Sequence, residues 1–408
     1  MSKTMVRRCA LFLLVVVGIC TAGAQETTKM SGFWESRDLV IKPGTKGPKV
    51  RIGVWDSGVD ISLFKGRIAS GKRRNILVRG YDSFKLRRDT PMEVLPAELL
   101  ARRDELNAAL NAYDDLDGGI DSPAARDLGA KLRKMSKAEL DDLENAAGRW
   151  AGYTHGTAVA DIAIAGNTLA EILIARMEWW HGSPPVPCWT KELADREAES
   201  IKDLLSFLVR NGARVVNMSW GRFERSYVNN LKECNPKMPE EDRLALARYT
   251  VGKIRPILQD GMKGAPNVLF VGAAGNDSTT VADANPATRF SLPNFILVGA
   301  VDRAGKAASF TNKGPEITLY ANGERIPARL PGGLISYPSG TSMATPNVAN
   351  AAAKMLTVNP KLTGAQMREI LESTADKNDA GLKLLHTAKA VEAARASAKK
   401  APQPVRRP

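Results

Sequence analysis

The stretch Tyr337–Pro346, YPSGTSMATP, runs directly into the alanine-rich segment Asn347–Leu356 (NVANAAAKML). It places Ser342 at the mouth of a predicted helix. A serine in that position is usually an N-cap, whose side-chain oxygen accepts a hydrogen bond from a backbone N–H. It can also be a nucleophile, because the positive end of the helix dipole favours developing negative charge. The rest of the chain has to decide between these two roles.

The composition is that of a globular protein of 408 residues, with 44% hydrophobic and 25% charged residues. This length permits one large or two medium domains. The net charge is +14, but the Pro/Ala-rich segment 393–408 has no acid and five basic residues (Arg395, Lys399, Lys400, Arg406 and Arg407). We expect this segment to be a disordered, solvated tail. Charge gathered in such a tail is not evidence for nucleic-acid binding, so we expect no nucleic-acid partner.

The first 24 residues have the three parts of a secretory signal peptide: a basic start at 1–8, an apolar run at 9–20, and small residues at 22–24. We therefore predict cleavage before Gln25, export to a periplasmic or extracellular location, and a short extension over residues 25–48. The apolar run is too short for a transmembrane helix, so no membrane span is expected after cleavage. A lipoprotein built on Cys20 is an alternative, although Ile19 does not fit the usual lipidation sequence.

Cleavage of the signal peptide would leave two cysteines, Cys188 and Cys234. In an oxidising compartment an even pair is typical of one disulfide. Two separate thiols are the alternative, and the sequence alone leaves both open.

From residue 49 onward, short apolar runs alternate with helical segments. This alternation predicts an α/β domain over residues 49–392, with a mostly parallel sheet covered by helices on both faces in three αβα layers. The predicted strands are Val50–Trp55, Glu171–Met177, Arg214–Met218, Asn267–Ala273, Asn294–Val301 and Glu316–Tyr320. The predicted helices are Gly156–Ala165, Leu193–Arg210, Glu241–Met262 and Thr345–Leu356.

Residues 90–150 depart from this pattern, with leucines at helical spacing and a capping-box sequence at Ser136–Glu139. They predict a helical hairpin inserted into the α/β domain, with Asp114–Pro123 (DDLDGGIDSP) as its turn. The spacing of the aspartates does not match an EF-hand loop. An acidic turn is therefore favoured over a calcium site, and structural calcium stays an unsupported alternative.

Three polar residues occupy positions where a parallel sheet gathers its ligands, at the carboxyl ends of strands and at helix starts. Asp56 directly follows the first strand, His155 begins an alanine-rich helix, and Asn276 follows the strand at 267–273. Taken alone, Asp56 or Asn276 is most simply interpreted as a turn residue, and His155 as an exposed polar residue. The chain's other histidines, His181 and His386, have surroundings that do not suggest chemistry.

Taken together, five stretches resemble the Asp, His, substrate-strand, oxyanion and Ser motifs of the subtilisin-like serine proteases (the subtilase family, peptidase S8 type): VWDSGVD, THGTAVA, VVNMSWG, FVGAAGND and SGTSMATPNVA. The resemblance spans residues 50–356, with the helical insertion set aside. It implies a subtilisin-like fold and a serine endopeptidase that acts on protein or peptide substrates and requires no cofactor for its chemistry.

By this resemblance Ser342 is the nucleophile, His155 is the general base and acid, and Asp56 orients and stabilises the imidazolium. Asn276 and the backbone N–H of Ser342 would form the oxyanion hole. The resemblance also implies a peptide channel lined by Ser219, Trp220, Gly221, Ala274 and Gly275.

The chain departs from the family's pattern in three places. Ala158 stands where a second histidine is usual, and Arg222 stands where a glycine is frequent. The segment 25–48 is too short for the folded pro-domain that secreted members generally carry. We therefore hypothesise that the insertion has a regulatory or partner-binding role, since it lies in sequence between Asp56 and His155. A decorative surface insertion is the alternative.

A catalytically silent relative that binds peptides as a scaffold is the alternative function. The filled catalytic positions argue against it. A nucleotide-binding protein is excluded because neither a P-loop sequence nor a G-x-G-x-x-G sequence follows a strand.

Overall fold

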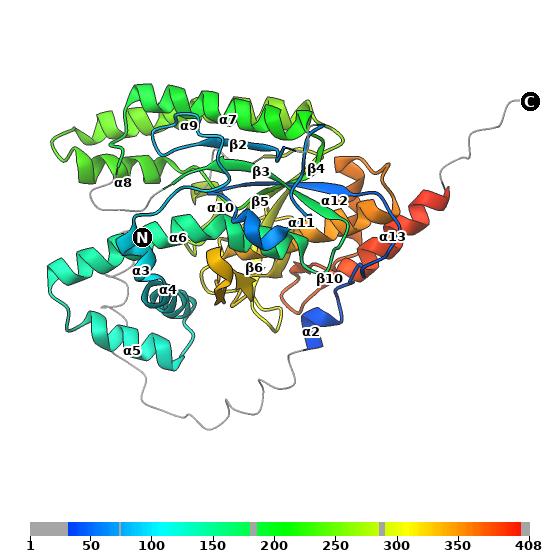
Figure 1. The fold of residues 1–408 in the computed structure, drawn as a ribbon, viewed down its shortest axis with the longest axis horizontal. Coiled ribbons are helices and arrows are strands. Elements are labelled where there is room, and N and C mark those ends of the chain that lie inside the picture. Colours follow the sequence, from blue (N-terminus) through cyan, green and yellow to red (C-terminus); the bar gives the residue numbers. More distant parts are fainter. Residues whose placement is uncertain (1–31, 73–74, 180–185, 285–289, 401–408) are drawn as a thin grey trace, which may run out of the picture.

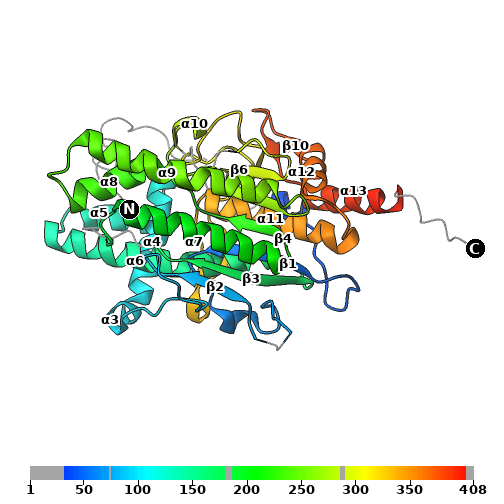
Figure 2. The same cartoon turned by 90° about the horizontal axis from the view of Figure 1, so that it is seen from above.

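A computed structural model describes residues 32–72, 75–179, 186–284 and 290–400 (Figure 1). The predicted signal peptide, His181 and the last eight residues lie outside this part. Within it, the predicted α/β architecture is confirmed: a nine-stranded, mostly parallel sheet lies between two layers of helices (Figures 1 and 2).

The sheet has the strand order β10-β11-β7-β6-β5-β4-β1-β3-β2. All neighbouring strands in it are parallel except β10 and β11. A separate antiparallel pair is formed by β8 (Ala328–Arg329) and β9 (Ile335–Ser336). The strands of the large sheet are β1 (Val50–Asp56), β2 (Val78–Tyr81), β3 (Ala170–Met177), β4 (Ala213–Met218), β5 (Leu269–Ala273), β6 (Phe295–Val301), β7 (Leu319–Asn322), β10 (Asp376–Lys377) and β11 (Lys383–Leu384).

The sequences of the central strands are continuously apolar and rich in β-branched residues, as in FILVGAV of β6. Apolar and polar residues do not alternate in them, because both faces of these strands are buried. All six predicted strands are present, with ends that differ from the predicted ones by at most three residues. The largest shift moves the predicted strand Glu316–Tyr320 to β7. The edge strand β2 was not predicted, because its four residues, VRGY, are only partly buried and carry no apolar run.

The helices α6 and α11 pack on one face of the sheet, and α7 and α9 cover the other (Figures 1 and 2). Alanines of α6 and α11 let both helices approach the strands closely. The α-helices are α2 (Gly32–Glu35), α3 (Ala97–Ala101), α4 (Arg103–Gly118), α5 (Pro123–Leu132), α6 (Lys137–Ile164), α7 (Lys191–Arg210), α8 (Glu224–Cys234), α9 (Glu240–Lys263), α10 (Val281–Ala284), α11 (Thr341–Val358), α12 (Gly364–Ser373) and α13 (Thr387–Lys400), with short 3-10 turns η1 (Ile61–Phe64) and η2 (Pro331–Gly333).

The helical insertion is present, but it is more closely joined to the α/β domain than the sequence predicted. The helix expected to begin at Gly156 begins at Lys137, behind a capping box formed by Ser136 and Glu139. No proline interrupts it, so one helix of 28 residues carries the insertion into the core of the domain. The expected turn at 114–123 is also too long, because α4 continues to Gly118. Its C-cap Gly119 has φ 69°, the left-handed conformation that glycine accepts without strain.

The insertion has an apolar cluster of its own between α4, α5 and the first half of α6. Leu106, Leu143 and Trp150 are buried there almost completely. This cluster explains why a segment outside the α/β pattern holds a defined conformation.

The prediction of a disordered tail is wrong for residues 393–400, because these residues form the last part of the helix α13. Ala394 is fully buried against the core, and its carbonyl accepts a hydrogen bond from Asn359 Nδ2 at 3.3 Å. Ala394 forms a buried apolar face of α13 together with Ala390 and Val391, and the basic charge of the segment gave no sign of this face.

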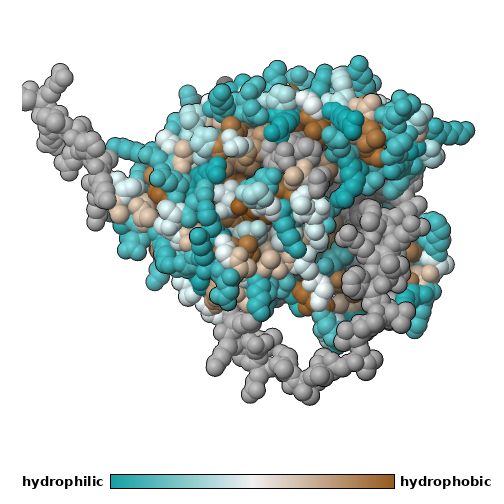
Figure 3. All heavy atoms as spheres, turned by 180° about the vertical axis from the view of Figure 1, so that it is seen from behind, coloured by the Kyte–Doolittle hydropathy of each residue, from teal (hydrophilic) through white to brown (hydrophobic). Residues whose placement is uncertain are grey.

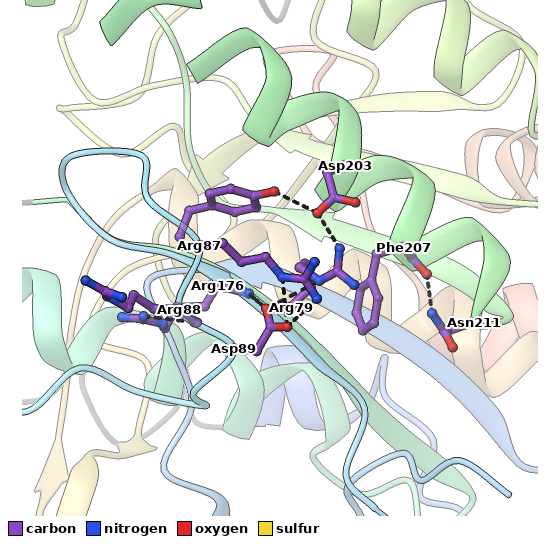
Figure 4. A network of polar contacts seen from close by, with 10 residues as sticks. Arg79, Arg87, Arg88, Asp89, Arg176, Asp203, Phe207 and Asn211 are labelled. Atoms are coloured by element: carbon purple, nitrogen blue, oxygen red, sulfur yellow. Dashed lines mark hydrogen bonds and ion pairs between the residues drawn. The ribbon is translucent and has the colours of Figure 1, made fainter. Parts of the chain in front are cut away.

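A polar network holds the edge strand β2 to α7 (Figure 4). Arg79 pairs with Asp203 of α7, and its Nε lies 3.3 Å from Asp89 Oδ1. Tyr81 donates a hydrogen bond to Asp203 at 2.8 Å; burial and this carboxylate raise the pKa of Tyr81 to about 12. Asp89 also binds Arg87, so the network fixes the loop that follows β2.

On the face shown in Figure 3, hydrophilic side chains predominate and apolar ones form separate patches. Of the helices in the described residues, none combines the length and the hydropathy that a membrane crossing requires.

Candidate active site

The carboxyl ends of β3, β4 and β5 and the start of α11 meet at one cleft of about 610 Å³. His155, Asn276 and Ser342 line this cleft, as do Ser219 and Gly221. Residues separated by up to 187 positions in the sequence, from 155 to 342, therefore share one site. The parallel sheet brings them together, because its strands all end at the same edge.

Asp56 and His155 form a direct pair. Asp56 is the last residue of β1 and is 1% exposed; its Oδ1 lies 2.7 Å from His155 Nδ1 and accepts the backbone N–H of Ser57 at 2.8 Å. Burial alone disfavours the imidazolium, but the charge and hydrogen bond of Asp56, with a contribution from Asp114, outweigh it and raise the pKa of His155 above its ordinary value. The site is therefore built to support a protonated histidine.

Gly156 allows this pair to form. A Cβ at this position would lie 2.2 Å from the carbonyl oxygen of Gly58 and 3.1 Å from Asp56 Oδ1. The Gly156 N–H donates to Ser57 Oγ at 3.0 Å. Only glycine lets α6 approach the end of β1 closely enough for the histidine to reach the aspartate.

Ser342 is the second residue of α11. Its Oγ donates to the carbonyl oxygen of Ser219 at 3.2 Å, and Ser219 Oγ donates to the Ser342 carbonyl at 2.8 Å. Ser342 and His155 both lie in the part of the chain that the structure describes, and no hydrogen bond joins them in it. The structure thus brings the serine and histidine into one cleft with the hydroxyl directed at Ser219.

Asn276 caps the helix that carries Ser342. Its Oδ1 accepts the backbone N–H and the hydroxyl of Thr341, each at 2.8 Å. The N-cap residue of α11 is Gly340, which has no side chain, so the capping oxygen comes from a residue that follows a distant strand. Because two donors fix Oδ1, the amide nitrogen is free to point elsewhere, and it lies 3.2 Å from where a Cβ on Gly340 would stand.

The predicted channel residues divide into two groups. Ser219, Trp220, Gly221 and Gly275 line the cleft. Trp220 is only 6% exposed, and its ring also packs edge-on against Trp55, with the ring centroids 5.0 Å apart. Ala274 is fully buried and does not line the cleft; the neighbouring Ala273 does.

Trp179 is a cleft residue that the sequence did not single out. Its ring meets the His155 ring edge-on, with centroids 5.3 Å apart. It lies two residues beyond the end of β3, the strand beside β1. Its position after a central strand was the signal that could have found it.

Arg222, which replaces the frequent glycine, is turned toward a buried carboxylate. Its Nε lies 2.8 Å from Glu197 Oε1, and Tyr227 donates to Glu197 Oε2 at 2.7 Å. Burial together with Glu197 raises the pKa of Tyr227 well above its ordinary value. Lys85 Nζ also lies 3.9 Å from Glu197. The charge of Arg222 is therefore paired at the cleft wall.

Cys188 and Cys234 form a disulfide, with an S–S distance of 2.00 Å. The bond joins the rim loop before α7 to the end of α8. Asn230 adds two hydrogen bonds to the same loop, accepting the Trp189 N–H at 2.8 Å and donating to the Pro187 carbonyl at 3.1 Å. Pro187, Trp189 and Asn230 all line the cleft, so the disulfide supports its rim.

Replacing both cysteines by serine is expected to lower the free energy of unfolding by about 2–4 kcal/mol, because the unfolded chain regains the freedom of the loop the bond closes. We also expect KM to rise more than kcat falls, since the substitution loosens the rim and not the pair formed by Asp56 and His155. Urea unfolding and steady-state kinetics measure the two effects. An unchanged urea midpoint would show that the bond does not stabilise the rim.

The acidic turn of the insertion does not gather its aspartates. Asp115 lies 3.7 Å from Arg325, and Asp121 pairs with Arg126 at 2.6 Å. Among the described residues, no group of three or more His, Cys, Asp or Glu side chains is placed to hold a metal ion.

The chain matches the family model of the subtilase family (Peptidase S8) over residues 47–389. It belongs to the subtilase family. It is 43% identical over 108 residues to a subtilisin of Bacillus pumilus, a match covering 26% of this chain and 39% of that protein. It is 29% identical over 226 residues to a thermostable alkaline protease of Halalkalibacterium halodurans, covering 54% of this chain and 52% of the other. The matched part thus spans about half or less of these curated relatives.

Solved structures confirm the subtilisin-like fold. The structure of the subtilase cytotoxin SubAB aligns with a TM-score of 0.52 at 17% identity, covering 86% of this chain and 91% of that one. The A subunit of the AB5 toxin from E. coli aligns with a TM-score of 0.50 at 18% identity, covering 86% and 93%. At these identities the likeness concerns the fold alone.

Proposed function

We propose that this subtilase is an exported serine endopeptidase with Asp56, His155 and Ser342 as its catalytic triad. The observation that carries the proposal is the 2.7 Å pair between a buried aspartate and a histidine in the same cleft as a helix-start serine. Membership of a family of serine peptidases supports the same conclusion.

In the proposed reaction, the Ser342 hydroxyl turns from the Ser219 carbonyl toward the outer ring nitrogen of His155. Its oxygen forms a bond to the scissile carbonyl carbon while the histidine takes its proton. The histidine then gives that proton to the leaving nitrogen as the C–N bond breaks. Water repeats the sequence on the acyl-enzyme and releases the acid. Asp56 holds the ring with Nδ1–H toward itself and stabilises the imidazolium in both halves.

The oxyanion that forms on the carbonyl oxygen would be bound by Asn276 Nδ2 and the Ser342 backbone N–H. Support comes from the hydrogen bonds that fix Asn276 Oδ1 on Thr341, because they orient the amide before substrate arrives. The backbone of Ser219 and Gly221 is proposed to pair with the peptide substrate along the cleft, as extended peptides pair with exposed strand edges.

These steps use side chains and backbone groups of the chain itself, so we propose that the chemistry requires no cofactor. We also propose export through cleavage before Gln25. Intact-mass analysis of the protein recovered from the producing cell tests the cleavage position, and a mature form that retains residues 1–24 would overturn it.

Digestion of a proteome-derived peptide library tests the proposed activity. The wild type should cleave internal peptide bonds and show a side-chain preference. Ser342→Ala, prepared identically, should cleave none. A folded, mature wild type that cleaves no peptide but still retains peptides in pull-down would instead support a peptide-binding scaffold.

A further inference from the structure

The helical insertion reaches the loop that leads into Ser342. The C-terminal half of α4 lies against three loops around the nucleophile. The contacts are Ser336 Oγ and the Tyr337 N–H to Asn111 Oδ1 (2.9 and 3.3 Å), the Ser339 N–H to Asp114 Oδ2 (2.8 Å), Ser309 Oγ to the Asp117 and Gly118 carbonyls (3.3 and 3.0 Å), and Arg325 to Asp115 (3.7 Å).

The contact of Asp114 is the one nearest to the nucleophile. Its carboxylate accepts the N–H of Ser339, three residues before Ser342. Ser339 Oγ in turn accepts the Arg325 N–H at 2.9 Å, so the loop is held from both sides. Hydrogen bonds to an ionised acceptor are about twice as strong as neutral ones. A charged Asp114 therefore fixes the backbone from which α11 begins.

The charge of Asp114 also acts on His155. Asp114 contributes to raising the pKa of His155, after Asp56. Burial, with a contribution from Asp117 and Asp115 on α4, raises the pKa of Asp114 to about 7, although the Ser339 N–H and the charge of His155 act to lower it. Arg325, in the loop after β7, faces this group through its pair with Asp115.

We propose that Asp114, brought by the insertion, is a positioning residue of the active site: it fixes the loop that carries Ser342 and adds a second negative charge that supports the protonated form of His155. This rests on the function proposed above. It gives the insertion a part in the peptidase site itself. The insertion is then a component of the catalytic architecture, and not a surface decoration.

The charge can be removed without removing the contact. In Asp114→Asn the amide oxygen still accepts the Ser339 N–H, while the negative charge is lost. The matched control is Asp104→Asn, which makes the same charge change on the same helix, about 15 Å along its axis, at a side chain that is 75% exposed. Asp114→Ala removes both the charge and the contact.

The first measurement is the pKa of His155 by NMR, made in a Ser342→Ala background to prevent self-digestion. The mature chain has three histidines, which makes assignment by substitution simple. We expect the pKa of His155 to fall by about 0.5–1 unit in Asp114→Asn and to stay unchanged in Asp104→Asn. Equal values in the two variants would overturn the proposal. This readout requires no activity, so it separates failure of this inference from failure of the proposed function.

The second measurement is the pH profile of kcat/KM with Ser342 intact. Catalysis needs neutral His155 as the base, so a lower pKa moves the acidic limb to lower pH. The less stabilised imidazolium should also lower the plateau about three- to tenfold. A merely structural role would lower activity equally at every pH and leave the limb in place, and that result would contradict the proposal.

Discussion

Asp56→Asn will lower kcat by about 10⁴ while leaving the fold intact. The side chain sits at the end of β1 with 1% exposure and holds His155 through a single 2.7 Å contact. Asparagine has nearly the same shape, but its amide can offer an N–H to Nδ1 and so stabilise the wrong tautomer. It also removes the largest charge that favours the imidazolium.

Asp56→Asn should also change the pH dependence of the activity. The carboxylate raises the pKa of His155, so its loss lowers that pKa. The residual activity of Asp56→Asn should therefore reach its plateau at lower pH than the activity of the wild type. Steady-state kinetics from pH 5 to 9 measure both effects, with circular dichroism to verify folding and Asp104→Asn as the charge control. A folded variant that retains a tenth of the activity would show that this pair is not catalytic.

The second large effect is expected at Asn276. Asn276→Ala and Asn276→Asp should both lower kcat by about 10²–10³ with little change in KM, because each removes the Nδ2–H donor from the oxyanion. Aspartate also places negative charge where negative charge must develop.

The two Asn276 variants should differ in stability. Aspartate retains an oxygen for the N–H and hydroxyl of Thr341, so it keeps the cap on α11. Alanine loses the cap and should cost about 1 kcal/mol of unfolding free energy. Thermal unfolding measures the role of Asn276 as a helix cap, and steady-state kinetics measure its role as an oxyanion donor. If Asn276→Asp keeps near-normal kcat, Asn276 is a cap and not an oxyanion donor.

The sheet and the meeting of Asp56, His155, Asn276 and Ser342 could be predicted because parallel strands end at one edge, and each residue either follows a recognisable apolar run or precedes an alanine-rich segment. What the sequence left out depends on contacts between distant segments. The cap on α11 comes from a side chain 65 residues earlier, and the sequence pointed only to local candidates.

The insertion shows the same limit. Its helical spacing predicted helices, and Ser136 predicted a helix start. Nothing in the local pattern indicates that α4 docks on the loop at Ser339, 225 residues away, or that α6 continues without a break into the histidine helix. Arg222 could be recognised as unusual, but its pairing with buried Glu197 required the fold.

The central claim is that Ser342 is a nucleophile activated by His155, and a fluorophosphonate probe tests it most directly. Folded, mature wild type should acquire one covalent adduct, which peptide mass spectrometry should place on Ser342. Ser342→Ala should acquire none, and labelling of Asp56→Asn should be slower by orders of magnitude. A folded wild type that never labels, or an adduct on any other serine, would contradict the account.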